Sequence, residues 1–384
     1  MRIIVAPNAF KGSLTAVQAA EAMRAGILAA DPGCRVTAVP VADGGDGLVE
    51  VMLEGMGGQA VETTVTGPRF EAVTAPFCLV SAENLAVVEM ARASGLALLP
   101  ASQHDPMETT TYGTGELILS AMEYGARRII VGIGGSATCD GGIGMAAALG
   151  YRFLNADGEA VRPVGGELHA IATIDRSGVD ARIAGLDVAA ACDVTNPLTG
   201  PEGAARVYGP QKGATPEAVD RLDDGLAHLA RVIRRDLGVD ILELPGSGAA
   251  GGLGGGLRAF LNAELKTGID LVLDVVGLER HLTGADLVIT AEGQIDGQTR
   301  FNKAPAGVAR MARRAGVPCI AVCGAVGREI GALHDIGIDA VFSICSGPQT
   351  LEESMLAAAT LLSRSTEQVV RTFRAGRRSR PADQ

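Results

Sequence analysis

Short apolar runs that are not interrupted by alternating polar residues occur at both ends of the chain, and segments with helical spacing separate them. Residues 2–6 form the first run and residues 34–42 form the second. Between them, Thr15 and Gln18 have the spacing of a capping box, and the turn at residues 31–33 is expected to end the helix. This order predicts a β-α-β unit with two parallel strands.

The same order returns near the C-terminus. Residues 286–290, 318–324 and 340–345 are apolar runs of strand length. Pro305 suits the first turn of a helix that is expected to end near Ala315. Apolar runs without alternation are typical of parallel strands that helices cover on both faces, so these segments predict a continuation of the same sheet.

The middle of the chain has a different pattern. Residues 61–80 favour antiparallel strands, and Pro216 begins a long amphipathic helix whose apolar stripe is a core face. The length of 384 residues favours two domains. We therefore predict an α/β protein in which a doubly wound, flavodoxin-like parallel-sheet domain (residues 1–60 and 285–384) is split by an inserted mixed α/β domain (residues 61–284).

Composition narrows the functional classes. Hydrophobic residues make up 47% of the chain, and the net charge of −11 argues against a nucleic-acid-binding face. The sequence contains no run of 18 apolar residues, so no membrane span is expected. The first residues begin as a strand without the pattern of a signal peptide. With seven scattered cysteines and no C-x-x-C pair, the chain is expected to be a cytoplasmic protein with reduced thiols.

Polar, glycine-rich segments follow five of the predicted strands. In chain order they read PNAFKGS, DGGDG, GGSATCDGG, CDVTNP and AEGQIDGQ. Ligands bind beyond the carboxyl ends of the strands in open parallel sheets, so all five are candidate site loops. A single segment such as DGGDG is also what an ordinary turn looks like. Five together favour a ligand site.

The use of lysine gives a second indication. Only four of the 33 basic residues are lysine, and three of them (Lys11, Lys212 and Lys303) lie in loops of this kind. The lysine ammonium is a compact charge with three donors, which suits phosphate or carboxylate. Lys266 lies in a stretch that resembles a helix, and we interpret it as an ordinary surface residue.

The longest glycine tract, GSGAAGGLGGG, occupies residues 246–256. It contains a formal G-x-G-x-x-G at Gly246, Gly248 and Gly251, with Asp270 at the distance that a dinucleotide fingerprint requires. No β-α-β unit surrounds the tract, so a loop whose backbone amides bind phosphate is favoured. The sequence has neither a P-loop motif nor the H-R-D and D-F-G motifs of protein kinases.

The segments together resemble the bacterial glycerate kinase family of the two-domain type. The resemblance rests on PNAFKGSLTA, VADGGDG, GIGGSATCDGG, CDVTNPL, GSGAAGGLG and TAEGQID in this order, and it extends from Arg2 to about Thr372. It implies phosphorylation of D-glycerate with ATP and Mg²⁺, in glyoxylate, glucarate or galactarate catabolism, with the active site in the cleft of the split fold. It favours 2-phosphoglycerate as the product, with 3-phosphoglycerate as the alternative.

The candidate site residues come from these motifs. We expect Asp193 and Asp296 to be the essential carboxylates, one as base and one linked to Mg²⁺, without assigning which is which. Lys11 is expected to contact a phosphate or the glycerate carboxylate, and Asp43 and Asp46 to lie beside the substrate. Asp193 has the alternative role of bracing its own turn. The other substrate-binding candidates are Asn8, Asn196, Arg300 and Lys303, and the nucleotide-binding candidates are Gly134, Gly135, Ser136, Gly248, Gly251 and Gly252.

Two further functions stay open from the residues alone. A nicotinamide-dependent dehydrogenase of small acids would carry its fingerprint in the first β-α turn, where NAFKGS is not one. A two-lobed binding protein without catalytic activity is the other alternative. A thermal-shift comparison of ATP–Mg²⁺ with NADH separates the three, whereas the sequence makes no prediction of the oligomeric state.

Overall fold

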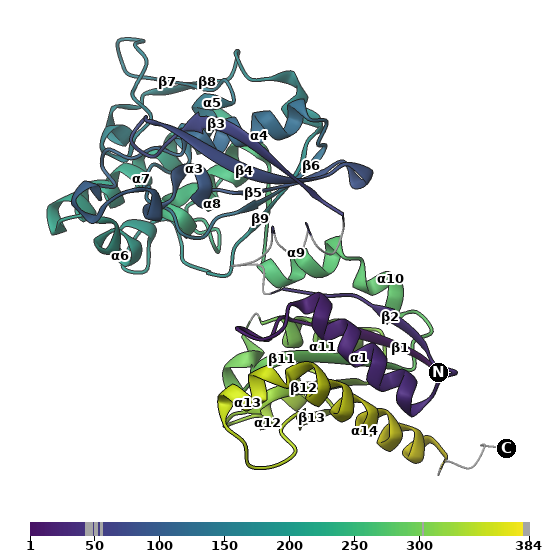
Figure 1. Ribbon diagram of the computed structural model, residues 1–384. Helices are drawn as coiled ribbons and strands as arrows, with labels where there is room; N and C mark the ends of the chain where they lie inside the picture. Colours follow the sequence, from purple (N-terminus) through teal and green to yellow (C-terminus); the bar gives the residue numbers. More distant parts are fainter. Residues whose placement is uncertain (43–48, 50–52, 54–56, 302, 379–384) are drawn as a thin grey trace. The chain divides into compact units, whose positions relative to one another are not determined.

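The computed structural model of the chain divides into two compact units. Unit 1 consists of Met1–Met56 and Ile269–Gln384, and unit 2 consists of Gly57–Gly268. The boundaries between the units therefore lie at 56/57 and 268/269. The sequence predicts domain boundaries at 60/61 and 284/285 instead. Figure 1 shows the chain, of which the structure describes residues 1–42, 49, 53, 57–301 and 303–378.

A five-stranded sheet forms the centre of unit 1. Its strand order is β13-β12-β11-β1-β2, and all four neighbouring pairs are parallel. The inner strand β1 pairs on one side with β2, which is close to it in sequence, and on the other side with β11, which comes from the far end of the chain. The strands are β1 (Arg2–Pro7), β2 (Arg35–Ala38), β11 (Leu287–Ile295), β12 (Cys319–Val326) and β13 (Ala340–Ser343).

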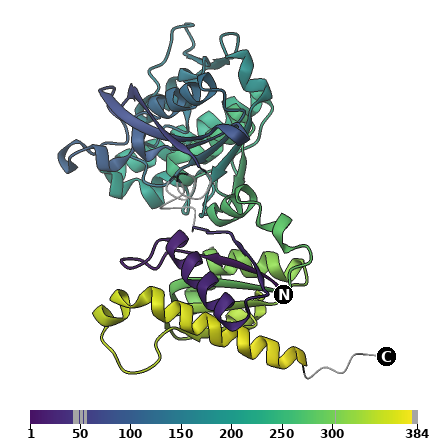
Figure 2. The same cartoon turned by 45° about the vertical axis from the view of Figure 1, so that its right-hand side comes forward.

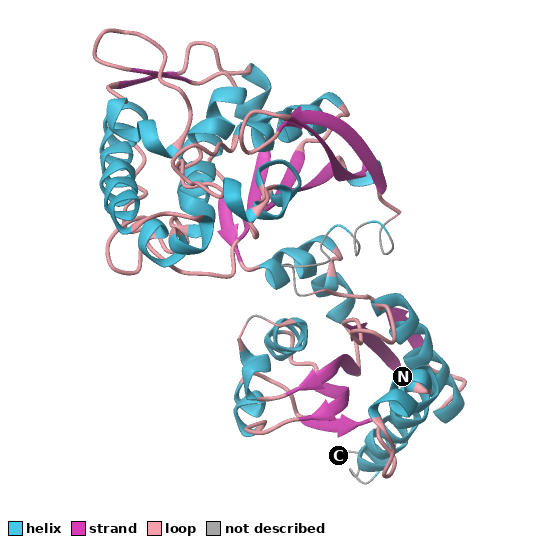
Figure 3. Cartoon of the chain, turned by 60° about the vertical axis from the view of Figure 1, so that its left-hand side comes forward, coloured by secondary structure: helices cyan, strands magenta, loops and turns pink. Residues whose placement is uncertain are grey.

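Helices cover both faces of this sheet (Figure 3). They are α1 (Ala16–Ala30), α9 (Gly268–Val275), α10 (Leu278–Leu282), α11 (Ala304–Arg314), α12 (Gly331–Asp335), α13 (Leu351–Leu356) and α14 (Ala358–Arg378). α1 and α14 lie side by side and share one core cluster with the sheet (Figures 1 and 2). They pack so closely that a Cβ atom on Gly26 would lie 2.1 Å from the carbonyl oxygen of Ser363. α11 packs against β1, β11 and β12.

Two helices that the sequence places in the inserted domain belong to unit 1. A Cβ atom on Gly307 of α11 would lie 2.4 Å from Cγ1 of Ile269 on α9, so α9 and α11 pack in direct contact. α10 also contacts α11. The apolar side chains of α9 are thus buried against unit 1, and this burial moves the boundary toward the N-terminus.

Strand β11 is longer than the sequence predicts. The prediction of a loop directly after residue 290 is wrong, because the strand continues to Ile295. Gln294 pairs with Ala325 and Ile295 with Val326 of β12. Gly324 contributes to this continuation, because a Cβ atom there would lie 2.5 Å from the carbonyl oxygen of Gly293.

Unit 2 contains a six-stranded mixed sheet with the order β10-β9-β6-β5-β4-β3. β10, β9, β6 and β5 run parallel, while β4 pairs antiparallel with both β5 and β3. The predicted antiparallel pair is therefore confirmed, whereas residues 264–266, expected to be helical, form β10. The strands are β3 (Gln59–Thr66), β4 (Ala72–Val80), β5 (Leu85–Glu89), β6 (Arg128–Gly132), β9 (Asp187–Ala191) and β10 (Glu264–Lys266), with a separate antiparallel pair of β7 (Arg152–Leu154) and β8 (Thr173–Asp175).

Helices of unit 2 pack on this sheet around one large core cluster. They are α3 (Ala91–Ser94), α4 (Tyr112–Glu123), α5 (Ile143–Ala148), α6 (Ala204–Tyr208), α7 (Pro216–Leu237) and α8 (Leu253–Leu261). The long helix predicted from Pro216 is confirmed as α7, which buries Leu222, Leu226 and Leu229 along one stripe. Among the described residues, no helix has the length and apolar character needed to cross a membrane.

Candidate functional site

A cavity of about 870 Å³ lies in unit 1, lined by residues in the last part of β11 and β12 and by residues after the ends of the strands. Open parallel sheets bind their ligands at this edge, and the volume is within the range of small-molecule sites. Three of the sequence-predicted residues line this cavity, namely Lys11, Asp296 and Lys303. The fold therefore brings Lys11 to the same cavity as Asp296 and Lys303, which lie almost 300 residues later in the sequence.

The two lysines reach the cavity from different elements. Lys11 is exposed and follows β1, whereas Lys303 is partly buried and occupies the N-cap position of α11. Asn8 is buried near the same end of β1, where its Oδ1 accepts a hydrogen bond of 2.8 Å from the amide of Ala9. Asn8 thus supports the backbone next to the cavity.

Asp296 has a structural task as well as a place in the cavity wall. It is the N-cap of the short 3₁₀ helix η8 (Gly297–Arg300), and its Oδ1 accepts from the amide of Gln298 at 2.9 Å. Its own amide donates to Oγ1 of Thr299, which completes a capping box. Bracing of this kind was weighed for Asp193, and the structure shows it for Asp296.

Glu292 is a cavity residue that the sequence analysis did not select. It lies on β11 within the TAEGQID segment, is 8% exposed and lines the same cavity as Asp296. A buried carboxylate at the carboxyl end of a parallel strand was the available signal. It was missed because the segment was interpreted as a loop with Asp296 as its acid.

Arg300, which is predicted to bind substrate, makes a different contact in the structure. Its guanidinium carbon lies 4.5 Å from the centre of the Phe301 ring, in a cation–π contact, and the residue does not line the cavity. Asp43 and Asp46 lie outside the residues that the structure describes. Their placement beside the substrate stays a prediction from the sequence.

In unit 2, three of the predicted site loops lie against one another. The amide of Gly141 donates to the carbonyl oxygen of Gly251 at 3.1 Å, which joins the loop after β6 to the glycine tract. The amide of Gly248 donates to the carbonyl oxygen of Asn196 at 3.1 Å, which joins the tract to the loop after β9. Two of these loops follow the neighbouring parallel strands β6 and β9, so the sheet itself brings these two together.

The loop after β6 presents free backbone donors. Gly134 and Gly135 are exposed, and their amide N–H groups donate to no residue that the structure describes. Gly135 has a φ of +74°, in the left-handed region. Successive free amides beside a left-handed residue are typical of anion-binding sites. The predicted nucleotide-binding role of Gly134, Gly135 and Ser136 has a suitable geometry here.

The glycine tract is buried, and its glycines are needed for packing. A Cβ atom on Gly251 would lie 2.0 Å from the carbonyl oxygen of Thr138, and one on Gly248 would lie 2.1 Å from that of Pro197. Gly252 approaches Gly141 in the same way. Among the described residues, no strand precedes the tract at residues 241–244, so the arrangement of a dinucleotide fingerprint is not present.

Asp193 and Asn196 lie in the loop after β9. Asp193 is exposed, and its Oδ1 accepts from the amide of Gly268 at 3.0 Å. Asn196 is held at both ends of its side chain, because Nδ2 donates to the carbonyl oxygen of Glu202 and Oδ1 accepts from the Tyr208 hydroxyl at 2.7 Å. Asn196 therefore braces the chain between β9 and α6.

Two buried charged residues lie behind the exposed loop of unit 2. Lys212 is 2% exposed, and its Nζ donates to Oγ of Ser136 at 2.6 Å and to the carbonyl oxygen of Thr138 at 2.7 Å. Asp140 is fully buried, and its carboxylate accepts from Thr111, Gly142 and Gly144. Burial raises the pKa of Asp140, and these hydrogen bonds oppose the rise. Because lysine is rare in this chain, the sequence already indicated that Lys212 could have a special role.

A family model for glycerate kinases matches residues 3–374. The chain belongs to the glycerate kinase family. Membership places it among kinases that transfer a phosphoryl group to an alcohol, and not among the dehydrogenases or non-catalytic binding proteins that the residues alone left open.

Curated members of the glycerate kinase family align with almost the whole chain. The glycerate kinase of Bacillus subtilis is 46% identical over 374 residues, which cover 97% of this chain and 98% of the relative. The glycerate 2-kinase of Escherichia coli is 45% identical over 379 residues, which cover 99% and 100%. A crystal structure of a Salmonella typhimurium protein assigned as glycerate kinase 2 matches with a TM-score of 0.86 at 46% identity, over 98% of this chain and 99% of the other.

The Mg²⁺ that the sequence resemblance implies would need carboxylate ligands. In the part of the chain that the structure describes, no three His, Cys, Asp or Glu side chains gather closely enough to hold a metal by themselves. Kinase magnesium sites need only one or two carboxylates in addition to phosphate oxygens. Two carboxylates, those of Glu292 and Asp296, line the same cavity of unit 1.

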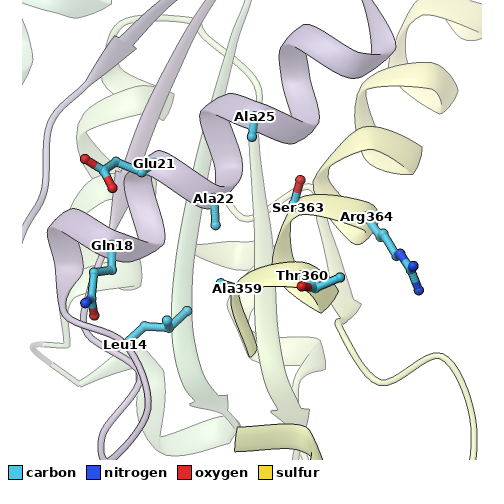
Figure 4. A pocket seen from close by; sticks show the side chains of 9 residues that line it. All are labelled: Leu14, Gln18, Glu21, Ala22, Ala25, Ala359, Thr360, Ser363 and Arg364. Atoms are coloured by element: carbon cyan, nitrogen blue, oxygen red, sulfur yellow. The ribbon is translucent and has the colours of Figure 1, made fainter. Parts of the chain in front are cut away.

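A second hollow, of about 560 Å³, lies between α1 and α14 in unit 1 (Figure 4). Its walls combine alanines such as Ala22 and Ala359 with Glu21 and Arg364. Leu14, from the segment after β1, also lines it, and none of the residues predicted for the site does. Lys11, Asp296 and Lys303 line the larger cavity instead.

Proposed function

We propose that the protein catalyses the ATP-dependent phosphorylation of D-glycerate to 2-phosphoglycerate and ADP. The observation that carries this proposal is the 45% identity to the glycerate 2-kinase of Escherichia coli over 99% of this chain. That relative is named as a glycerate 2-kinase, which favours the 2-hydroxyl over the 3-hydroxyl as the phosphoryl acceptor. 3-Phosphoglycerate is the alternative product.

D-Glycerate binds, in this proposal, in the cavity of unit 1. Lys11 and Lys303 supply two positive charges for the glycerate carboxylate and the transferred phosphoryl group. The cavity of about 870 Å³ is larger than a three-carbon acid requires. The remaining space suits the phosphoryl group that the substrate receives. Asn8 supports the backbone at this end of β1 by accepting a hydrogen bond from the amide of Ala9.

Mg²⁺ is proposed to bind at Asp296, with Glu292 as a second carboxylate of the same cavity. Carboxylate oxygens are the protein ligands that Mg²⁺ prefers, and the ion supplies charge neutralisation for the phosphoryl group when bound. One oxygen of Asp296 accepts the amide of Gln298, and the other accepts from Nε2 of Gln294 at 3.3 Å. These contacts fix the orientation of the carboxylate. Asp193 stays the proposed second essential acid on the basis of its motif.

The nucleotide phosphates are proposed to bind the exposed loop of unit 2 at Gly134, Gly135 and Ser136. Its free amides support this assignment. We also propose that Gly248, Gly251 and Gly252 act mainly by holding that loop through Thr138 and Gly141, since their contacts are packing contacts.

The remaining proposals concern fold and supporting residues. We propose that unit 1 is a flavodoxin-like domain interrupted by unit 2. Numbered by occurrence within unit 1, its strand order is 2-1-3-4-5, which supports this assignment. Asp43, Asp46, Asn196 and Arg300 stay proposed contributors to substrate binding, with Asn196 and Arg300 the weaker candidates because of their contacts to Tyr208 and Phe301.

Phosphorus NMR of the reaction mixture tests this function. The purified protein is incubated with D-glycerate, ATP and MgCl₂, and the product resonance is compared with authentic 2- and 3-phosphoglycerate. We expect 2-phosphoglycerate and stoichiometric ADP, with little turnover of L-glycerate. The 3-phosphoglycerate resonance would overturn the regiochemistry alone. Absence of any phosphoglycerate, with the protein folded, would overturn the proposed reaction.

A further inference from the structure

Lys212 is a buried cation behind the exposed loop of unit 2. It belongs to the short 3₁₀ helix η6 (Pro210–Lys212), and its side chain extends beneath the loop that follows β6. Among the described residues, its two hydrogen-bond acceptors are Oγ of Ser136 and the carbonyl oxygen of Thr138, and both are neutral oxygens. A buried charge without a contacting counter-ion is costly, so its retention calls for a physical reason.

The titratable groups that face Lys212 do not neutralise it by contact. The titratable groups that interact electrostatically with Lys212 are Cys139 and Asp140 of the loop. Asp223 of α7 interacts in the same way with Cys139. Burial raises the pKa of Cys139 to about 12, so this thiol is neutral near neutral pH. The Asp140 carboxylate accepts four hydrogen bonds from other groups. Burial lowers the pKa of Lys212 to about 8.

The contacts of Lys212 lie directly next to the free amides. Ser136 follows Gly134 and Gly135, two exposed residues whose N–H groups have no protein acceptor among the described residues. One side of this loop thus presents backbone donors outward, and the other side is held by an ammonium group. Both features favour an anion on the exposed side.

We infer that Lys212 is a positioning residue of the nucleotide site, which holds the Gly134–Thr138 loop in place and supplies positive charge beneath it, so that phosphate binding and protonation of Lys212 favour each other. This inference rests on the proposed function, because it takes the nucleotide phosphates as the anion. It adds a residue to the site and a dependence of nucleotide affinity on pH.

The coupling follows from linkage. An anion bound on the exposed side stabilises the charged form of Lys212 more than the neutral form, so its pKa rises in the complex. By reciprocity, the protonated protein binds the nucleotide more tightly than the neutral one. Binding near pH 8 therefore takes up protons, and affinity falls as the pH rises above 8. A lysine that served packing alone would show neither effect.

Isothermal titration calorimetry with ADP tests this inference. Titrations at pH 8 in buffers with different ionisation enthalpies give the protons taken up. We expect an uptake of up to about half a proton by the wild type, relative to Lys212→Met. The comparison cancels protons exchanged by ADP itself. Lys212→Met should raise the Kd for ADP by about tenfold at pH 7, the scale of one charge lost near a phosphate.

Matched variants make the result specific. Lys266→Met removes the same charge from a lysine of unit 2 that pairs with Glu264, and its Kd and proton uptake should equal those of the wild type. Ser136→Ala removes one contact but keeps the buried charge, so proton uptake should persist. If Lys212→Met does not fold, proton uptake on ADP binding is measured for the wild type and Ser136→Ala between pH 7 and 9. Uptake by both proteins supports the inference, and the absence of uptake in both overturns it.

Two different failures are distinguishable. An equal Kd for ADP in wild type and Lys212→Met, without a difference in proton uptake, overturns the role of Lys212 and leaves the kinase function intact. If the wild type binds no ADP at pH 7 and forms no phosphoglycerate in the NMR assay, the proposed function fails and the inference fails with it.

Discussion

Asp140 and Thr111 are joined by two hydrogen bonds of 2.8 Å each, one from the backbone amide of Thr111 and one from its hydroxyl. The same hydroxyl accepts from the amide of Met145 at 2.8 Å. One pair of residues thus fixes the start of α4, the end of the loop after β6 and the start of α5. A buried carboxylate with four donors is a structural centre of unit 2.

The first prediction concerns this centre. In Asp140→Asn, an amide NH₂ group would face backbone donors, so at least one of them loses its acceptor. We expect a loss of about 2–4 kcal/mol in the free energy of unfolding. Urea unfolding measures it. Asp157→Asn, in an exposed turn, is the matched control and should change stability by less than about 0.5 kcal/mol. Wild-type stability in Asp140→Asn would contradict the structural role.

A second prediction concerns Lys11. Its side chain is exposed, so Lys11→Met should unfold as the wild type does. The loss of its charge in the cavity should lower kcat/KM for D-glycerate by about 10²-fold or more. A coupled assay of ADP release measures this, with Lys266→Met as the lysine control. Near-normal activity would remove Lys11 from the site.

The third prediction separates chemistry from capping at Asp296. Asn keeps an acceptor for the amide of Gln298 at the N-cap, so Asp296→Asn should lose less than about 1 kcal/mol of stability. Loss of the charge should lower kcat by about 10³-fold. Steady-state kinetics beside thermal melting provides the test. Activity within tenfold of the wild type would leave Asp296 as a helix cap only.

Asp193 is tested in the same way. Asp193→Asn keeps an acceptor for the amide of Gly268, and we expect normal melting with about 10³-fold lower kcat. If both Asn variants stay active while Asp43→Asn or Asp46→Asn is inactive, the essential carboxylates are those of the DGGDG segment. That result would reverse the assignment made from the motifs.

The fourth prediction contrasts two glycines. Gly251 has a φ of +70°, and a Cβ atom there would lie 2.0 Å from the carbonyl oxygen of Thr138. Gly251→Ala should therefore destabilise unit 2 by about 2 kcal/mol or more. A Cβ atom on Gly134 would meet no atom within 4 Å. Gly134→Ala should therefore fold normally but raise the KM for ATP more than that for D-glycerate. The opposite change in KM would assign the loop to the acid substrate.

The fifth prediction concerns stability and pH. Burial lowers the pKa of Lys212 from 10.5 to about 8, so between these values the unfolded chain binds more protons than the folded one. The free energy of unfolding contributed by Lys212 therefore rises with pH in this window. From pH 7 to 9, the wild type should gain about 1 kcal/mol relative to Lys212→Met. Urea unfolding at both pH values checks it, and a constant difference would contradict the shift.

Local sequence signals predicted local structure well. The capping box of Thr15 and Gln18 is confirmed at the start of α1, and Pro216 begins α7 as expected. Mixed α/β architecture with parallel sheets is confirmed too. These features depend on neighbouring residues or on the alternation of apolar runs, which the sequence displays directly.

Features that depend on tertiary contacts were not predicted. β11 continues through AEGQI because β12 pairs with it, and a polar, glycine-containing segment gives no sign of this partner. Lys212 could be noted as a rare lysine, yet its insertion beneath Ser136 depends on how η6 packs. Asn196 was chosen for its amide, and only the fold shows that Glu202 and Tyr208 occupy it.

The position of β1 between β2 and β11 has a consequence for synthesis on the ribosome. Ile3 pairs with Leu287, and Gly26 of α1 packs against Ser363 of α14, so unit 1 needs both ends of the chain. Unit 2 is continuous in sequence and can fold while the rest is still being translated. A chain released after unit 2 but before β11 would leave the β11-facing edge of β1 unpaired, which is the kind of apolar edge that promotes aggregation.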